Sequence, residues 1–143
     1  MSKQIPVPNE LGKPFWDAAK QKRLEVQNCT ACNRLQYPPN DVCNVTGINP
    51  GCGSGDHLGW KEVTGRGHIM EFFVVRDSRI KRMQPDQPFN IALVSLDEDP
   101  NINFLSNLPG TAPGDVHVGD AVEVLFEPVE GSDQLIPEWV VMK

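Results

Sequence analysis

Four cysteines are the residues of this chain best suited to chemistry, and all of them lie within one stretch of 24 residues. Cys29 and Cys32 have the C-x-x-C spacing that lets two neighbouring turn residues reach one metal ion, whereas Cys43 and Cys52 are separated by eight residues. Four thiolates held in short polar turns make a tetrahedral Zn²⁺ site with a structural role. The sequence therefore predicts one structural zinc ion bound by these four cysteines.

Disulfide bonds are the alternative use of four cysteines, with three possible connectivities. Residues 1–14 contain no apolar run of signal-peptide length, so we expect a cytoplasmic protein whose thiols stay reduced. Asn33 and Gly53 directly follow the second and fourth cysteines. Both residue types tolerate the positive φ at which backbone N–H groups turn toward sulfur. Zinc is therefore the favoured interpretation.

No catalytic residue is predicted. If zinc takes all four cysteines, none is left to act as a nucleophile. The three histidines, His57, His68 and His117, have no mutual spacing that indicates a catalytic pair, and a lone histidine is most often a surface or packed residue. The chain also lacks a G-x-S-x-G, an H-E-x-x-H and a P-loop motif.

The composition places limits on the fold. The chain has 143 residues, of which 39% are hydrophobic and 22% charged, so it forms one ordinary domain or two very small ones. No apolar stretch approaches the roughly 18–20 residues of a membrane span. Thirteen prolines and twelve glycines favour short strands and frequent turns over a helical bundle. We therefore expect a mainly β protein outside the membrane.

The net charge of −6 is distributed unevenly along the chain. Residues 1–82 hold twelve Lys and Arg against eight Asp and Glu, whereas residues 83–143 hold only Lys143 against eleven acidic residues. The acidic second part would repel a phosphate backbone, which counts against general nucleic-acid binding. A localised anion site in the first part is compatible with this distribution.

Residues 1–23 are predicted to form an extended arm followed by a helix. Asn9 can cap a helix over residues 11–23, and Pro14 is tolerated only in a first turn. Phe15 and Trp16 give this helix an apolar face, which is either part of the core or a docking surface. With Trp139 near the C-terminus, they are the candidate partner-interface residues.

The remaining residues are predicted to form a rubredoxin-like zinc ribbon over 24–64 and a five-stranded OB-fold barrel over 65–143. In the ribbon, short strands at 24–27, 35–37 and 58–63 flank the cysteine turns. Beyond the boundary at Gly65–Gly67, alternating or apolar runs indicate five further strands at 68–75, 91–97, 102–108, 121–127 and 135–141. The run at 91–97 shows little alternation, so we expect it to be buried on both faces. Five strands with turns between them, and no helical pattern long enough for a βαβ unit, favour an OB barrel.

A basic cluster of Arg76, Arg79, Lys81 and Arg82 follows the first predicted barrel strand, and Arg66 is counted with it as a nearby cation. It is either a solvated loop or an anion site, because guanidinium groups bind phosphate oxygens in a bidentate manner. The cluster is therefore a candidate site for a ligand that carries phosphate groups.

The order of the motifs resembles a bacterial and archaeal family of zinc-ribbon plus OB-fold accessory proteins that partner thiolases and HMG-CoA synthases. The resemblance runs from about residue 9 to the end of the chain and depends on Pro14-Phe15-Trp16, Leu24, Cys29-Thr30-Ala31-Cys32, Tyr37-Pro38-Pro39, Trp60, Val63, Gly65, Gly67, Val94-Ser95-Leu96-Asp97, Val118-Gly119-Asp120-Ala121-Val122 and Pro137. Family members that keep the metal usually have a second C-x-x-C. The spacing of Cys43 and Cys52 departs from that pattern and puts the geometry of the second turn in question.

The resemblance implies a non-catalytic subunit of a hetero-oligomer. Such a subunit binds a thiolase-fold partner and helps to form the channel for coenzyme A thioesters. Coenzyme A carries a 3′-phosphate and a diphosphate, so the resemblance makes the basic cluster a candidate site for coenzyme A. Implied partner classes are acetoacetyl-CoA thiolases, steroid side-chain aldolases and the thiolase that cleaves benzoylsuccinyl-CoA. The alternative function is a single-stranded nucleic-acid-binding module, because zinc ribbons and OB barrels both commonly bind single strands.

Overall fold

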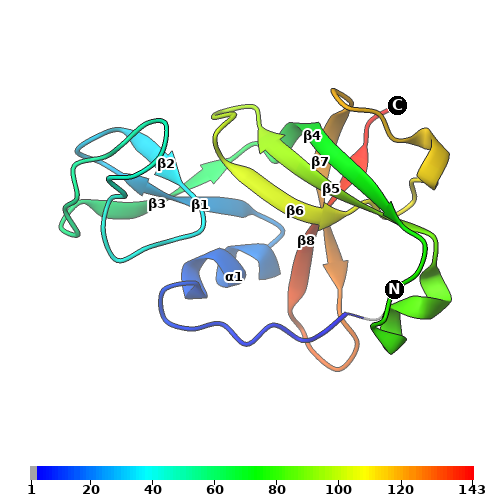
Figure 1. The fold of residues 1–143 in the computed structure, drawn as a ribbon. Helices are drawn as coiled ribbons and strands as arrows, with labels where there is room; N and C mark the ends of the chain where they lie inside the picture. Colours follow the sequence, from blue (N-terminus) through cyan, green and yellow to red (C-terminus); the bar gives the residue numbers. More distant parts are fainter. Residues whose placement is uncertain (1–2) are drawn as a thin grey trace.

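One short α-helix and eight strands build residues 3–143, the part of the chain that the computed structural model describes. Helix α1 (Lys13–Lys20) precedes a three-stranded antiparallel sheet in the order β2-β1-β3. Its strands are β1 (Leu24–Cys29), β2 (Arg34–Gln36) and β3 (Leu58–Val63). In Figure 1 this sheet lies at the left, the larger sheet lies at the right, and α1 lies below the junction between them.

The second sheet has five antiparallel strands in the order β6-β5-β4-β7-β8. They are β4 (Arg66–Val75), β5 (Phe89–Leu96), β6 (Asn103–Asn107), β7 (Ala121–Pro128) and β8 (Leu135–Val141). Two 3₁₀ turns, η1 (Lys81–Asp86) and η2 (Pro113–Asp115), lie in the loops. The predicted mainly β fold, with a helix, a ribbon and a five-stranded OB barrel, is confirmed.

The barrel is nearly closed where β6 approaches β8. No strand pairing joins these two strands in the described residues, but Ser106 bridges them. Its hydroxyl donates to Glu138 Oε2 at 2.9 Å and accepts from the Trp139 backbone N–H at 3.2 Å. The Ser106 side chain therefore replaces part of the backbone hydrogen bonding that would join β6 to β8. We call this side of the barrel the β6–β8 seam.

Helix α1 is shorter than the helix expected over residues 11–23. It begins at Lys13, and Pro14 lies in its first turn, where a backbone N–H would have no partner within the helix. Asn9 does not cap the helix itself, because its Oδ1 accepts from Gly12 N at 2.8 Å in the preceding turn. Lys22, with φ 58°, ends the helical path.

One hydrophobic cluster joins the helix, the ribbon and the barrel. It includes Phe15 of α1, Val26 of β1, Val94 of β5, Phe104 of β6 and Trp139 of β8. Because the ribbon strands share this core with the barrel, the ribbon does not depend on its own small interior alone. The division into residues 1–23, 24–64 and 65–143 stays a prediction.

Strand β5 departs from its expected burial on both faces. Its residues alternate between buried and half-buried, because no second layer covers the outer face of the barrel. Residues directly opposite each other in an antiparallel pair share a face, so the neighbours of the half-buried Ile91 and Leu93 also face outward. The outer face of β4, β5 and β6 is therefore open.

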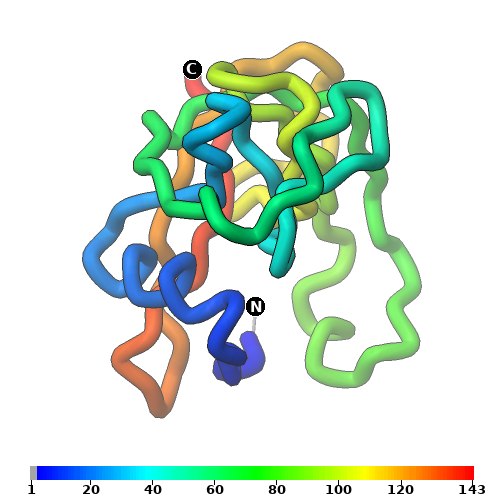
Figure 2. Tube along the Cα trace, turned by 90° about the vertical axis from the view of Figure 1, so that its left-hand side faces the viewer, coloured from blue at the N-terminus to red at the C-terminus, as the bar shows by residue number. Residues whose placement is uncertain are grey.

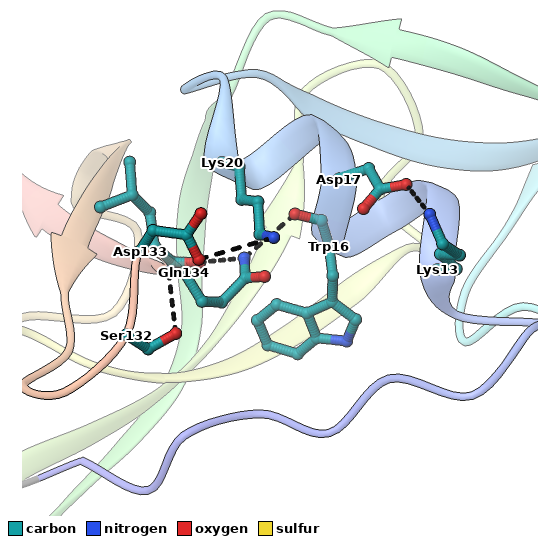
Figure 3. A network of polar contacts seen from close by, with 8 residues as sticks. Lys13, Trp16, Asp17, Lys20, Ser132, Asp133 and Gln134 are labelled. Atoms are coloured by element: carbon teal, nitrogen blue, oxygen red, sulfur yellow. Dashed lines mark hydrogen bonds and ion pairs between the residues drawn. The ribbon is translucent and has the colours of Figure 1, made fainter.

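Two polar contacts tie α1 to the hairpin between β7 and β8, as Figure 3 shows. Gln134 Nε2 donates to the backbone oxygen of Trp16 at 3.0 Å, and Lys20 lies 3.6 Å from Asp133. Gln134 is buried, so this hydrogen bond fixes the middle of the helix on the barrel.

The N-terminal arm is fixed by a partly buried ion pair. Lys3 Nζ lies 2.7 Å from Glu138 Oε1, with side-chain exposures of 14% and 6%. Replacing Lys3 by Met would leave the Glu138 carboxylate without its cation, which we expect to lower the free energy of unfolding by about 2–3 kcal/mol.

Urea denaturation measures this effect, with Lys13→Met as the matched control. Lys13 pairs with Asp17 at 2.6 Å, but these side chains are 66% and 51% exposed (Figure 3). An exposed pair of this kind contributes about 0.3–0.5 kcal/mol. Equal effects of the two substitutions would show that the Lys3 pair has no special role.

Candidate metal centre and ligand surfaces

The four cysteines meet in one cluster at the end of the small sheet. Cys29 ends β1, Cys32 lies in the turn before β2, and Cys43 and Cys52 come from the long connection between β2 and β3. Their sulfur atoms all lie within 4.8 Å of one another. Cys29 and Cys43 are buried, whereas Cys32 and Cys52 are exposed.

The geometry of the cluster fits Zn²⁺. Zinc–sulfur bonds of about 2.3 Å place the sulfurs of a tetrahedral site about 3.8 Å apart. The Cys29–Cys52 and Cys32–Cys43 sulfur pairs are each 3.9 Å apart, and all four cysteines are free rather than disulfide-bonded. Four thiolates leave no open coordination position, so an ion held here would stabilise the ribbon and would not activate water.

The eight residues between Cys43 and Cys52 form a closed loop that returns Cys52 to the cluster. Backbone hydrogen bonds at its base join Gly51 N to Asn44 O at 2.6 Å and Gly53 N to Cys43 O at 3.0 Å. Gly51 has no substitute here, because a Cβ atom on it would lie 2.1 Å from Cys43 Sγ. The unusual spacing is therefore compatible with a four-sulfur site.

The two turn residues that follow cysteines adopt the conformation expected of them. Asn33 has φ 53° and Gly53 has φ 76°, both in the left-handed region. A single asparagine or glycine enters this region readily because asparagine bonds locally and glycine has no Cβ. The prediction made for these two positions from residue type is confirmed.

A pair of buried glutamines supports the segment that carries Cys43, and sequence reasoning assigned no functional role to either. Gln36 Nε2 donates to Gln27 Oε1 at 2.6 Å and to Val42 O at 3.0 Å. The same Gln27 oxygen accepts from Asn40 N, and Gln36 Oε1 accepts from Asn44 N. These bonds satisfy the backbone on both sides of Cys43. No sequence signal indicated this role, because the alternation of residues 24–27 groups Gln27 with Glu25 rather than with the buried Leu24 and Val26.

Arg34 is the charged residue in contact with the cysteine cluster. Its Nη1 lies 3.7 Å from Cys43 Sγ and donates to Asn44 O at 3.0 Å. Burial raises the pKa of the Cys43 thiol, but the hydrogen bond from Arg34, together with bonds from the Cys52 backbone and the other cysteines, lowers this pKa to about 6. The surroundings therefore favour the thiolate at Cys43, which is the form that binds metal.

Strand β4 separates one member of the basic cluster from the other four. Arg66 begins this strand and Arg76 follows its end, ten residues later, so the two positions lie about 30 Å apart along an extended strand. The grouping of Arg66 with the other four cations is therefore wrong, because β4 separates the two ends.

The remaining cations form the basic loop, which we define as Arg76, Arg79, Lys81 and Arg82. All four are exposed, and within residues 3–143 none of them forms an ion pair. The buried Ser78 organises the loop, because its backbone oxygen accepts from Gln84 Nε2 and its hydroxyl accepts from Ile80 N. In Figure 2 this green segment projects from the barrel on the side away from α1.

The aromatic candidates lie in one groove between α1 and the β6–β8 seam. Phe15, Trp16 and Trp139 line this groove, together with Phe104 and Tyr37, and its volume is 280 Å³. Two of these three candidate interface residues belong to the core, because Phe15 is 7% and Trp139 is 1% exposed. These rings pack on Phe104 in the core, with centroid distances of 6.4 and 5.8 Å. Only Trp16, which is half-buried, stays available at the surface.

An exposed and mainly apolar surface that sequence reasoning missed lies on the outer face of the barrel, where it also includes the exposed Glu71 opposite Leu93. We call it the outer patch and define it as Met70, Phe73, Ile91, Leu93 and Leu105. Phe73 pairs with Ile91, and Leu93 pairs with Leu105, so these side chains share a face. Phe73 is 53% and Leu105 is 70% exposed. The patch adjoins the aromatic groove, which Ile91 and Leu105 also line.

No histidine of residues 3–143 belongs to the cysteine cluster. His68 Nδ1 lies 2.8 Å from Asp97 Oδ1, and His117 Nδ1 lies 3.6 Å from Asp120 Oδ2; both histidines are exposed. Within residues 3–143 the four cysteines form the only group close enough to hold a metal ion. None of the helices described is long and apolar enough to cross a membrane.

A four-cysteine ribbon joined to an OB barrel defines the class of this protein, and comparison with known families identifies it further. The model of the ChsH2 rubredoxin-like zinc ribbon domain matches residues 16–57, and that of the ChsH2 C-terminal OB-fold domain matches residues 60–127. The chain belongs to this ChsH2 family of zinc-ribbon and OB-fold proteins. The zinc ribbon and the clustered cysteines support a structural zinc ion.

Two solved structures share the fold. A chain of the Ltp2-ChsH2(DUF35) aldolase is 28% identical and superposes with a TM-score of 0.79, over 96% of this chain and 98% of that one. A DUF35-family protein of unknown function from Sulfolobus solfataricus is 18% identical with a TM-score of 0.63, over 93% and 86% of the two chains. At that identity the second likeness shows the fold alone.

A curated relative from Thermomonospora curvata is named probable enoyl-CoA hydratase alpha subunit. It is 33% identical over 124 residues, which cover 85% of this chain and 34% of the relative. The chain therefore spans about a third of the length of that relative.

Proposed function

We propose that this protein is a non-catalytic accessory subunit of a thiolase-superfamily enzyme that acts on coenzyme A thioesters. The observation that carries the proposal is the likeness over nearly the whole chain to one chain of the Ltp2-ChsH2(DUF35) aldolase. The four cysteines also support it, because sulfurs that bind zinc cannot act as the nucleophile that becomes acylated in thiolase chemistry. The partner would be a thiolase-fold subunit of a hetero-oligomer.

The outer patch and the adjoining groove are the surfaces best suited to this partner. Interface centres are formed by apolar and aromatic side chains that become fully desolvated, and Phe73 and Leu105 are exposed apolar residues on one face. Trp16 would contribute from the wall of the groove. Phe15 and Trp139 would act only indirectly, by shaping the floor beneath it.

Affinity purification of the tagged protein from its native host, followed by mass spectrometry and gel filtration, tests this proposal. We expect a thiolase-fold protein in a stable complex. The purified chain alone should show no thiolase, aldolase or synthase turnover, and the partner should lose activity without it. Turnover by the chain alone, or a partner that is fully active without it, would contradict the accessory role.

The basic loop would bind the phosphate groups of coenzyme A at the mouth of a shared channel. Exposed guanidinium groups without internal partners are free to form bidentate bonds with phosphate. Replacing Arg79 and Arg82 together by Ala should raise the KM of the complex for its thioester substrate about 10-fold, since each bond contributes roughly 0.5–1 kcal/mol after screening. The value of kcat should change less, because ground state and transition state share this contact.

Steady-state kinetics of the assembled complex at low and high salt measures this change. Arg66→Ala is the matched control, because Arg66 is also exposed but lies at the opposite end of β4. We expect the double variant to differ from wild type more at low salt, and the control to keep the wild-type KM. An unaltered KM in an intact complex would show that the basic loop is a solvated loop that does not bind coenzyme A.

Single-stranded nucleic-acid binding is the second candidate. Phe73 is exposed on the outer face of an OB barrel, three positions before the first arginine of the basic loop, and such a pairing of aromatic and cation can stack a base. The acidic residues of 83–143 oppose it. Fluorescence anisotropy with labelled single-stranded DNA at low salt discriminates the two functions.

A further inference from the structure

The second cysteine turn has a different construction from the first. Cys29 and Cys32 are held by a tight turn between two paired strands, whereas Cys43 and Cys52 are the ends of a loop whose residues 45–50 are all exposed. That loop has no buried side chains between positions 45 and 50 to fix its shape. The backbone hydrogen bonds at the base of the loop hold its two ends together, and contacts from outside the loop then place these ends relative to the first turn.

Arg34 makes such a contact. It begins β2 and lies directly opposite Cys29 in the pairing of β1 with β2, so the first turn fixes its position. From there its Nη1 reaches Cys43 Sγ at 3.7 Å and Asn44 O at 3.0 Å. One guanidinium nitrogen therefore joins the first turn to both the sulfur and the backbone of the second.

Two further observations indicate that the position of this guanidinium group is specific. A Cβ atom on Gly51 would lie 2.8 Å from Arg34 Nη1, so the loop leaves space for the group only because position 51 is glycine. The Nε atom of Arg34 is buried without a hydrogen-bond partner. Burying a donor in this way is unfavourable, so the contacts of the other nitrogens must compensate for it.

We propose that Arg34 is the positioning residue of the metal centre: it closes the long second turn and compensates the charge of the bound tetrathiolate. Four thiolates around Zn²⁺ carry a net charge of −2, and two of the sulfurs are buried. A guanidinium group in contact with Cys43 Sγ reduces that charge locally and donates to the thiolate. Residues that contact metal ligands in this way typically change metal affinity 10-fold to 100-fold when they are replaced.

The first test compares zinc affinities in competition with a chromophoric chelator. Arg34→Met keeps the aliphatic stem and removes the charge, and we expect its zinc affinity to fall about 10-fold to 100-fold. Arg34→Lys keeps the charge on a shorter side chain without the planar fork, so its affinity should lie between those of Met and wild type. Arg23→Met is the control, because Arg23 bonds to Gln21 and Glu25 outside the cluster.

The second measurement separates contact with sulfur from a general structural effect. In the cobalt-substituted protein, the thiolate-to-metal charge-transfer absorption depends on hydrogen bonds to the sulfurs. We expect this absorption to shift in both Arg34 variants and to stay unchanged in Arg23→Met. If Arg34→Met does not fold, Arg34→Lys carries the test. Wild-type zinc affinity in Arg34→Lys, or an affinity loss with an unshifted cobalt spectrum, would overturn the proposal.

Discussion

Replacement of Cys43 by Ser is expected to abolish zinc binding and to unfold the ribbon. Cys43 is fully buried in the cysteine cluster, and serine is a poor ligand for Zn²⁺ in place of a thiolate. A structural zinc site contributes about 10–16 kcal/mol of apparent binding free energy at neutral pH, and this energy is coupled to folding. The loss of one ligand of four should therefore be the largest effect of any single substitution in this chain.

Elemental analysis should show one zinc ion per wild-type chain and almost none in Cys43→Ser. The barrel should keep its near-UV signal at low temperature, since Trp139 lies in its core, but its melting temperature should fall. The reason for that fall is the shared cluster, to which Leu24, Val26 and Val63 of the ribbon contribute.

Ala31→Ser is the matched control for the zinc measurement. It introduces the same side chain into the exposed turn between Cys29 and Cys32 without removing a ligand. We expect full zinc content and wild-type stability. A wild-type protein that lacks zinc after purification under reducing conditions, or that contains two disulfide bonds, would contradict the metal centre.

Charge introduced into the outer patch should have the second largest effect, on binding of the proposed partner. Replacing Phe73 and Leu105 together by Asp would place two carboxylates at the centre of the interface. Central apolar residues of an interface each contribute about 2 kcal/mol or more, so the dissociation constant should rise about 1,000-fold. Isothermal titration calorimetry with the purified partner measures the change.

Ile48→Asp tests whether the effect belongs to the outer patch. Ile48 is also apolar and is 90% exposed, but it lies in the loop between Cys43 and Cys52 rather than on the barrel. We expect this variant to bind like wild type. If the double variant binds normally, the partner does not use the outer patch, and Trp16→Ala would then show whether the groove alone is the docking surface.

Local patterns in the sequence were sufficient for most of the fold. The alternation of residues 121–127 and the β-branched run at 68–75 predicted strands, because side chains on a strand face two sides in turn. The C-x-x-C spacing and the residue type at Asn33 predicted the first turn of the metal centre, and Gly53 predicted the positive φ that follows the last cysteine. Each of these signals depends on residues within a few positions of one another.

The tertiary structure decided what depends on distant residues. Cys52 returns to the cluster through the backbone bonds that Gly51 and Gly53 form with Asn44 and Cys43, which spacing alone does not reveal. Burial of Phe15 and Trp139 follows from packing against Phe104, about 90 and 35 positions away in the chain. An aromatic side chain has the same chemical character in a core and at an interface, so only the packed structure distinguishes the two.

The basic loop and the outer patch also differ in how far the sequence alone could predict them. The sequence located the basic loop, because its cations are close together in the chain, but it wrongly included Arg66, since the length of β4 separates the two ends. It missed the outer patch, because Phe73, Leu93 and Leu105 become neighbours only through strand pairing. The sequence by itself determined the types of residue and the local turns, and the register of the sheets decided which of them face one another.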